Sequence, residues 1–288
     1  MQMIYVIIVN YKTENVIEDA IRSFEEEEIN IHIIVLDNGS TESSYKVLQK
    51  MTNDRVELIR SDTNLGFTGG VNYAAEYIKN KYKNLEYLFL FNPDAISSKN
   101  LVGNLYKVLS CNNNVAAVSP HILTMDNISW FSGGMIDWEK CEILNNPYVV
   151  NPNEIRKVDI YNGCAVLFDA KKFYEARMLD NDLFIYFDEA FLSMRFLEMG
   201  YQCFYHPDLI AYHHVPYGTS SDSTLKTYYM TRNHIFFFKK YSKKKICFYL
   251  CIDIFKTLLS HAKYFKVSNV YYVFLAVYDA IRGKKRIL

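Results

Sequence analysis

The sequence predicts an α/β fold in which a mostly parallel, twisted sheet is flanked by helices. Short apolar runs recur through the first half of the chain, at residues 4–9, 31–37, 56–60, 87–91 and 115–119. Segments of helical length and polarity separate these runs, and we expect helices to begin near Glu14, Thr41, Gly69 and Lys99. Buried strands that alternate with helices are typical of a parallel sheet covered on both faces.

Later parts of the chain are less regular. Residues 126–162 contain Gly133-Gly134 and two prolines, which predict a hairpin or loop excursion. Regular structure resumes at residues 162–168 (NGCAVLF), and a helix is expected from about Asp188 to Met199. Beyond Ser221 the chain becomes helical and rich in aromatic residues and lysines. We therefore place a main domain at residues 1–222 and a C-terminal helical region at residues 223–288.

The composition excludes several classes of protein. A chain of 288 residues can bury a sizeable core, so a small disulfide-stapled fold is excluded. Lys plus Arg equals Asp plus Glu at 32 each, so no global field attracts nucleic acid, and we expect no nucleic-acid partner. The six cysteines form no Cys-x-x-Cys pair and no cluster at zinc spacing, which favours reduced thiols in the cytosol.

The sequence predicts no transmembrane helix. Its first apolar run, MIYVIIVNYK, is too short for a signal peptide and is interpreted as a buried strand. Two apolar stretches near the C-terminus are interrupted by Asp253, Lys256 and Asp279. Neither stretch reaches the roughly 20 uninterrupted apolar residues that a spanning helix needs.

Polar clusters follow three of the predicted strands, at Asn10-Tyr11, at residues 37–41 (DNGST) and at Asn92-Pro93-Asp94. Because ligands bind beyond the carboxyl ends of parallel strands, we expect the three clusters to meet at one edge of the sheet. The Asp37 carboxylate can accept hydrogen bonds from a base or ribose while Gly39 lets the chain turn away. The alternative is an ordinary strand-to-helix turn with Ser40 or Thr41 as the helix N-cap.

A glycine-rich segment, NLGFTGGVN at residues 64–72, opens another predicted helix. Backbone N–H groups at a helix N-terminus favour an anion, so a diphosphate or its sugar can lie nearby. A dinucleotide-binding fingerprint is excluded, because it requires G-x-G-x-x-G directly after the first strand, where Asn10-Tyr11-Lys12 stands.

Several side chains are candidates for metal binding or proton transfer. Asp94 leaves a buried strand and can hold Mg²⁺ or Mn²⁺ against a diphosphate, although N-P-D is also ordinary turn chemistry. Asp188 and Glu189 begin a helix, where acids favour the helix dipole, yet a carboxylate beside aromatic rings can also act as a general base. His213-His214 can contact a metal or phosphate, or be an ordinary histidine pair.

Taken in order, eight segments of the chain resemble glycosyltransferase family 2, particularly its bacterial rhamnosyltransferase-like branch with the GT-A fold. They are VIIVNYK, VLDNGST, NLGFTGGVN, FNPDA, YNGCAVLF, FIYFDEAFLSMRFLEMGY, HHVPYGTSS and YYMTRNHIFFFKK, and they reach to about Tyr241. The resemblance implies a GT-A catalytic domain at residues 1–222, with a Rossmann-like nucleotide-binding half. It also implies an inverting transfer from a nucleoside-diphosphate sugar, a divalent cation (Mg²⁺ or Mn²⁺) and a cytoplasmic site.

The resemblance also assigns residues by position. Asp94 takes the last place of the metal-binding acidic motif, with His213 as a further metal contact. Glu189 takes the place of the base, and Asp188 is the alternative because the family usually has Glu-Asp where Asp-Glu stands here. Asn92 and Phe191 replace aspartates of many relatives, so a non-catalytic nucleotide-sugar-binding or scaffold protein remains the alternative function. The donor-binding residues would be Asn10, Tyr11, Asp37, Asn38, Gly39, Asn64, Gly66, Phe67, Asn72, Asn92 and Gly163.

The C-terminal region carries basic clusters around apolar helices. Residues 239–245 contain five lysines just before an aromatic helix predicted to begin at Ile246, and Lys284, Lys285 and Arg286 lie near the end. Such a pattern suits an anionic membrane surface, which would place a cytoplasmic enzyme at the inner face of the membrane beside a lipid-linked acceptor. The alternative is a tail that packs on the main domain or forms a homodimer interface.

Overall fold

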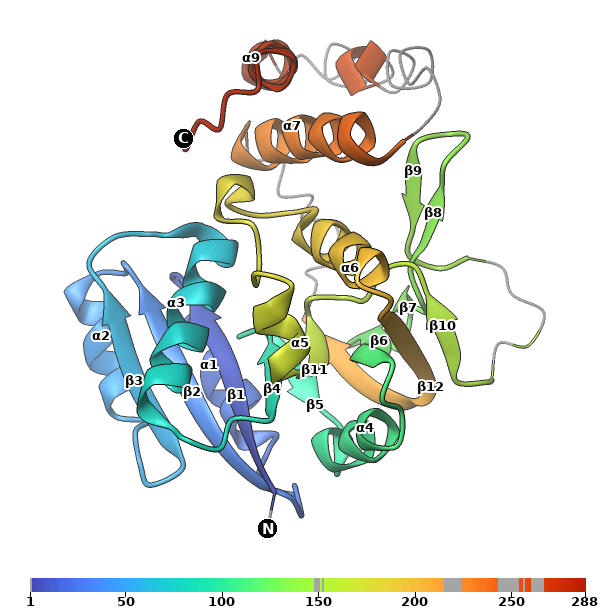
Figure 1. Cartoon of the computed structure of the whole chain (residues 1–288). Coiled ribbons are helices and arrows are strands. Elements are labelled where there is room, and N and C mark those ends of the chain that lie inside the picture. Colours follow the sequence, from blue (N-terminus) through green and yellow to red (C-terminus); the bar gives the residue numbers. More distant parts are fainter. Residues whose placement is uncertain are drawn as a thin grey trace.

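A mixed sheet runs through the centre of the protein and helices flank it, which confirms the predicted α/β fold class (Figure 1). The computed structural model describes residues 2–147, 151, 153–214, 224–242, 254–255, 257–259 and 267–288. Across the sheet the strand order is β10-β12-β6-β11-β4-β1-β2-β3, with β5 paired to β12 and β7 paired to β6. A separate hairpin is formed by β8 and β9.

The strands are β1 (Met3–Asn10), β2 (Asn30–Asn38), β3 (Val56–Ser61), β4 (Tyr87–Phe91), β5 (Ala95–Ser97), β6 (Val115–Thr124), β7 (Ser129–Phe131), β8 (Met135–Asp137), β9 (Glu142–Leu144), β10 (Arg156–Val158), β11 (Ala165–Asp169) and β12 (Gln202–His213). The helices are α1 (Ile17–Arg22), α2 (Glu42–Gln49), α3 (Gly66–Lys81), α4 (Leu101–Ser110), α5 (Ala170–Glu175), α6 (Asp188–Glu198), α7 (Thr224–Tyr241) and α9 (Val267–Arg282), with a 3-10 turn η1 (Asn181–Leu183).

The first half of the chain forms a parallel unit. Strands β3, β2, β1 and β4 lie side by side in that order and all run parallel. This is the strand order 3-2-1-4 of a nucleotide-binding α/β half. Seven of the eight residues of β1 are buried, because helices cover a parallel sheet on both faces and no side chain of a central strand reaches water. The carboxyl ends of β1, β2 and β4 therefore meet at one edge.

The second half of the sheet is mixed. Strand β11 runs antiparallel to both of its neighbours, β4 and β6, whereas β12 is parallel to β6. The predicted excursion at residues 126–162 contains the β8–β9 hairpin and the short strands β7 and β10. The antiparallel β11 brings the segment that precedes it, Asn162-Gly163-Cys164, back to the carboxyl end of β4, where the Asn92 N–H donates to the Cys164 carbonyl oxygen at 2.9 Å.

The start of α2 agrees with the sequence prediction, whereas α1, α3 and α4 begin two or three residues away from the predicted positions. Thr41 caps α2 by accepting a hydrogen bond from the Ser44 N–H at 3.3 Å. Helix α1 begins at Ile17 rather than near Glu14, because a turn at the Thr13 carbonyl precedes it. Helix α3 begins at Gly66 rather than Gly69, since the Asn64 side chain accepts from the Gly66 N–H. Helix α4 begins at Leu101, two residues after Lys99.

The C-terminal helices α7 and α9 pack against each other in a layer beside α6 and the β8–β9 hairpin, at the top of Figure 1. The predicted boundary between residues 222 and 223, the lysines at 243–245, and the predicted helix start at Ile246 lie outside the described residues. Within the described part of the chain, no helix is long and apolar enough to cross a membrane.

Candidate active site

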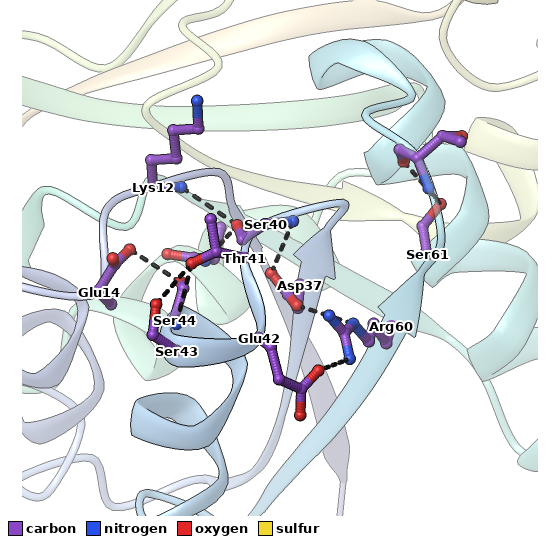
Figure 2. Close-up of polar contacts among 12 residues, drawn as sticks. Lys12, Glu14, Asp37, Ser40, Thr41, Glu42, Ser43, Ser44, Arg60 and Ser61 are labelled. Atoms are coloured by element: carbon purple, nitrogen blue, oxygen red, sulfur yellow. Dashed lines mark hydrogen bonds and ion pairs between the residues drawn. The ribbon is translucent and has the colours of Figure 1, made fainter.

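Polar side chains from β1 and β2 join at the carboxyl edge of the sheet (Figure 2). The Asn10 amide, which is fully buried, donates to the Ser40 hydroxyl at 3.3 Å, and the Lys12 N–H donates to the same oxygen at 3.3 Å. The Ser40 N–H in turn donates to an Asp37 carboxylate oxygen at 3.3 Å. The turn requires glycine at position 39, where φ is +74° and a Cβ atom would lie 2.3 Å from the Thr63 carbonyl carbon.

Arg60 on β3 lies against the Asp37 carboxylate. Its Nε is 3.3 Å from Asp37 Oδ2, its Nη1 donates to Glu42 at 2.8 Å, and its guanidinium covers the Tyr45 ring at 4.3 Å (Figure 2). Asp37 is fully buried, and its Oδ2 forms no hydrogen bond within the described chain despite the ion contact. A buried acceptor without a donor is costly unless a ligand supplies one.

The glycine-rich segment is tied to the end of β2. Asn38 donates to the Gly66 carbonyl at 2.9 Å and to Asn64 Oδ1 at 3.2 Å, and it accepts from the Leu65 N–H at 3.0 Å. The structure therefore brings Asn38, Asn64 and Gly66 together. Tyr11 is 40% exposed at the same edge, and Phe67 packs against the core.

Asn72 is one of the expected donor-binding residues, but its side-chain amide is hydrogen-bonded within the protein. The amide group donates to the Leu179 carbonyl at 2.8 Å and to Asn181 at 2.7 Å, and its oxygen accepts from the Leu179 N–H at 3.1 Å. These bonds join α3 to the segment that leads into η1. Asn72 thus positions the chain between α5 and α6, since its polar atoms are already paired within the fold.

Asp94 and His213 face each other across the sheet edge. The His213 Nε2 lies 3.2 Å from the Asp94 carboxylate, and the His214 N–H donates to the Asp94 carbonyl at 2.8 Å. Strand β12 places His213 there because it pairs antiparallel with β5, opposite Ala95. His213, rather than His214, is therefore the imidazole that faces Asp94.

Glu189 lies beside Gly163 of the segment that precedes β11. Its carboxylate accepts a 3.4 Å hydrogen bond from the Gly163 N–H, and a Cβ atom at position 163 would lie only 3.0 Å from Glu189 Oε1. Burial raises the pKa of the Cys164 thiol well above its usual value, and the charges of Asp94 and Glu189 raise it further. Gly163 donates to Glu189, and the next residue, Cys164, accepts from the Asn92 N–H, two residues before Asp94. The segment Gly163-Cys164 thus links the candidate base to the strand end that carries the candidate metal ligand.

The neighbouring acids Asp188 and Glu189 occupy different environments. Asp188 is 2% exposed, and both burial and the charge of Glu189 raise its pKa well above the usual range, which favours the protonated form of this carboxyl. Burial also raises the pKa of Glu189, but its own backbone N–H and that of Gly163 lower it in part. Glu189 therefore has backbone donors that stabilise its ionised form.

The loop that leads into α6 has an uncommon backbone. Phe184, Tyr186 and Phe187 have φ values of 67°, 68° and 65°, a region that bulky side chains seldom occupy. Such residues cost on the order of 1–3 kcal/mol each and persist only where neighbours fix them. Part of this support comes from the glycine-rich segment, because the Thr68 N–H donates to the Phe184 carbonyl at 3.2 Å.

Sequence reasoning missed the main support of this loop, which is Arg232-Asn233 on α7. The fully buried Arg232 donates to the carbonyls of Asp182 and Leu183 at 2.8 and 2.9 Å. Asn233, also fully buried, donates to three carbonyls of the same loop, those of Leu183, Ile185 and Tyr186, at 2.9–3.1 Å. The segment YYMTRNHIFFFKK carried a family resemblance, but nothing in its local pattern indicated where these two side chains bind.

A cleft of about 600 Å³ opens beside Glu189, between the β8–β9 hairpin, the start of α6 and the helix α7. Its lining combines aromatic and polar side chains, as a sugar-binding site requires. Phe191 packs in an apolar cluster and meets the Phe237 ring edge-on at 5.4 Å. Residues that line the cleft include Asn145, Asn162, Tyr186, Phe187, Glu189, Met230 and His234.

A divalent cation fits the pair of Asp94 and His213. The two side chains offer a carboxylate and an imidazole at one point of the edge, and the buried His213 Nδ1 has no hydrogen-bond partner in the described chain. No group of three or more His, Cys, Asp or Glu residues that could hold a metal occurs among the described residues. Two protein donors suit an ion whose remaining ligands come from phosphate oxygens and water.

The parallel unit, the polar edge and the adjoining cleft define an α/β protein with the strand order of a nucleotide-binding half and a cleft of small-molecule size. The sequence model of glycosyl transferase family 2 matches residues 5–185, more than half of the chain. The chain belongs to this family.

Solved structures with the same fold include two glycosyltransferases. One is the mannosyltransferase PcManGT from Pyrobaculum calidifontis in complex with GDP-Man and Mn²⁺, with a TM-score of 0.63 and 14% identity over 98% of this chain and 87% of that one. The other is GalNAc-T7 with UDP, GalNAc and Mn²⁺, with a TM-score of 0.64 and 15% identity over 98% of this chain and 58% of that one. A comparison with curated protein sequences gave no match.

Proposed function

We propose that the protein is an inverting glycosyltransferase that moves one sugar from a nucleoside-diphosphate sugar to an acceptor hydroxyl. The observation that carries the proposal is the junction at Gly163-Cys164. Gly163 donates to Glu189, which lines the cleft, and Cys164 accepts from Asn92, two residues before Asp94 of the Asp94–His213 pair. This junction joins a site for a diphosphate to a site for an acceptor, with a carboxylate between them.

The nucleotide is proposed to bind at the edge formed by β1 and β2. The Asp37 Oδ2, which lacks a hydrogen bond, can accept from a ring N–H of the base once Arg60 yields to the ligand. The segment after Asn64 would border the diphosphate, because its backbone N–H groups open α3. Asn92 and Gly163 would face the donor sugar from the ends of β4 and the segment before β11.

The divalent cation, Mg²⁺ or Mn²⁺, is proposed to be held by Asp94 and His213. When bound, it neutralises the negative charge that develops on the departing diphosphate. Two solved proteins of this fold were obtained with Mn²⁺, which supports a divalent cation as the cofactor.

Glu189 is proposed to be the general base. Its carboxylate takes the proton of the acceptor hydroxyl, whose oxygen bonds to the anomeric carbon while the bond to the diphosphate oxygen breaks. The electron pair of that bond leaves with the nucleoside diphosphate. Because attack occurs opposite the leaving group, configuration inverts, and no second carboxylate is needed as a nucleophile.

The finer assignments rest on the resemblance to the rhamnosyltransferase-like branch. We infer dTDP-rhamnose or a UDP-hexose as donor and a lipid-linked oligosaccharide of bacterial surface polysaccharide synthesis as acceptor. A cytoplasmic location at the inner face of the membrane follows from that acceptor. The catalytic domain would span residues 1–222.

The proposal is tested with purified protein and a panel of nucleotide sugars, with Mn²⁺, Mg²⁺ or EDTA. A bound donor raises the unfolding temperature by mass action, and only the true donor is expected to do so strongly. Release of nucleoside diphosphate then measures transfer. We expect Asp94→Asn to lose metal-dependent turnover while its unfolding temperature without ligand is unchanged.

Two results would count against this assignment. Full metal-dependent turnover in the Asp94→Asn variant would remove Asp94 from the site. Tight donor binding without turnover on any acceptor would instead favour a non-catalytic nucleotide-sugar-binding or scaffold protein.

A further inference from the structure

The outer face of α9 carries a continuous stripe of exposed apolar side chains. Its five members recur at intervals of four and three residues, so they lie along one side of the helix. Their exposed fractions run from 49% to 77%, far above those of ordinary core residues. The stripe consists of Val267, Tyr271, Phe274, Tyr278 and Ile281.

The acidic residue of α9, Asp279, lies on the opposite, buried face of the helix. Asp279 is fully buried, where it accepts hydrogen bonds from the Tyr228 hydroxyl and the Arg286 Nε, both at 2.9 Å. In the sequence Asp279 interrupts an apolar run, but in the fold it points inward. The stripe is therefore free of negative charge from its own helix.

The described C-terminal segments, residues 224–242 and 267–288, are strongly basic. Asp279 is the single acidic residue in these two ranges, against eight lysines and arginines, although the whole chain is neutral. Most of the basic side chains are exposed around the stripe or on the neighbouring α7. The exposed ones are Lys226, Lys239, Lys240, Arg282, Lys284, Lys285 and Arg286.

We propose that the stripe on α9 is a docking surface for an anionic lipid bilayer. Apolar and tyrosine side chains beside exposed lysines and arginines are the composition of a helix that lies in a membrane interface. Each basic residue near an anionic surface adds attraction, which salt screens. A second copy of the chain is the less favoured occupant, because it would set two basic faces against each other.

Docking through α9 would bring the enzyme to an acceptor anchored in lipid, and this role rests on the proposed transfer reaction. Helix α9 packs on α7, and α7 supplies Lys226, Met230 and His234 to the wall of the cleft that contains Glu189. A bilayer on the outer side of α9 would thus lie one helix layer away from the acceptor cleft (Figure 1). An acceptor anchored in lipid would reach the cleft without leaving the membrane surface.

The test is co-sedimentation of the full chain with vesicles of phosphatidylcholine, with and without phosphatidylglycerol. The wild type is expected to bind the anionic vesicles, and less at high salt. The double variant Phe274→Asp/Ile281→Asp is expected to bind at least about tenfold more weakly, because the stripe can no longer enter the interface. A matched control is Val47→Asp, an exposed apolar residue on α2, 38% exposed, which should bind like the wild type.

A second variant, Arg282→Glu/Lys284→Glu, separates charge from apolar contact and should lose mainly the salt-sensitive part of binding. Unfolding temperature and nucleotide affinity, measured on every variant, show that the fold and the donor site are intact, so a failed docking site is distinguished from a failed transferase assignment. The proposal is overturned if the wild type binds no anionic vesicle at low salt, or if the stripe variant binds as well as the wild type. A wild-type dimer that the stripe variant converts to a monomer, without lipid binding, would assign the stripe to a second copy and also overturn it.

Discussion

The side-chain amide of Asn233 donates a 3.0 Å hydrogen bond to the carbonyl oxygen of Tyr186, two residues before Asp188. Two further bonds from the same amide reach Leu183 and Ile185. The C-terminal helix α7 thus fixes a loop whose backbone is uncommon and which ends at the proposed base. Asn233 is a positioning residue, because it acts on Glu189 through the loop.

The variant Asn233→Ala should lower kcat more than it changes the KM for the donor. The partly buried carbonyls of Ile185 and Tyr186 lose this donor, whereas the Leu183 carbonyl keeps its bond from Arg232. A buried group left unsatisfied costs about 1–3 kcal/mol, so the loop can relax and displace Glu189. The measurement is steady-state kinetics of nucleotide release, with the unfolding temperature of the same sample.

A matched control separates positioning from plain loss of stability. Ile235→Ala truncates a buried residue two positions away on α7, which is expected to cost about 2–5 kcal/mol without removing any bond to the loop. If Ile235→Ala lowers kcat as much as Asn233→Ala does, the positioning role is wrong.

Replacing Glu189 by glutamine should slow the chemical step by about 10²–10⁴-fold and leave donor affinity nearly unchanged. The amide keeps the size of the side chain but cannot take the proton from the acceptor hydroxyl.

In the wild type, burial raises the pKa of Glu189, and the protonated acid is inactive as a base. The rate should therefore fall as pH decreases through a pKa above the ordinary glutamate value, and Glu189→Gln should lack this limb. A larger loss in Asp188→Asn than in Glu189→Gln would exchange the two roles.

Much of the fold could be predicted from local patterns, whereas long-range contacts could not. The apolar run at residues 31–37 predicted β2, and the Thr41 hydroxyl predicted the start of α2, because both signals lie within a few residues. The direction of β11 has no such signal, since its apolar residues suit a parallel or an antiparallel neighbour. It is this reversal that brings Gly163 to Glu189.

In the candidate site, too, the contacts between distant segments could not be predicted from local patterns. Adjacent residues of a strand point to opposite faces, so the pair His213-His214 left two candidates until the pairing of β12 with β5 set the register. Likewise, the partners of Asn233 lie about 50 residues earlier in the chain. The polar clusters after β1, β2 and β4 could be predicted to meet, because parallel strands share one edge.

Asp188 should make the folded state less stable as pH rises. Burial and the charge of Glu189 raise its pKa well above the roughly 3.9 of an unfolded chain, so folding takes up a proton between these two values. The stability from the protonated form is complete below the unfolded pKa and is lost as pH increases toward the folded pKa. Each unit of difference corresponds to about 1.36 kcal/mol. Because Asp188→Asn is neutral throughout, its free energy of unfolding relative to the wild type should increase as pH rises above the unfolded pKa of roughly 3.9, as measured by urea unfolding. A pH-independent difference would show that Asp188 is ionised in the folded protein.

Gly163→Ala should reduce turnover while it preserves the fold. The added Cβ would lie 3.0 Å from Glu189 Oε1 and 3.5 Å from its Cδ and Cγ, so the carboxylate must move by a few tenths of an ångström. Backbone strain is not the reason, because the φ angle at Gly163 lies outside the left-handed range. Displacement of a base by such a distance lowers kcat, since proton transfer requires close approach of the carboxylate to the hydroxyl.

The control is Gly103→Ala in α4, where the nearest atom to an added Cβ is 3.7 Å away and alanine should stabilise the helix by roughly 0.5–1 kcal/mol. Equal kcat values for Gly163→Ala and the wild type would mean that Glu189 does not act from the position beside Gly163.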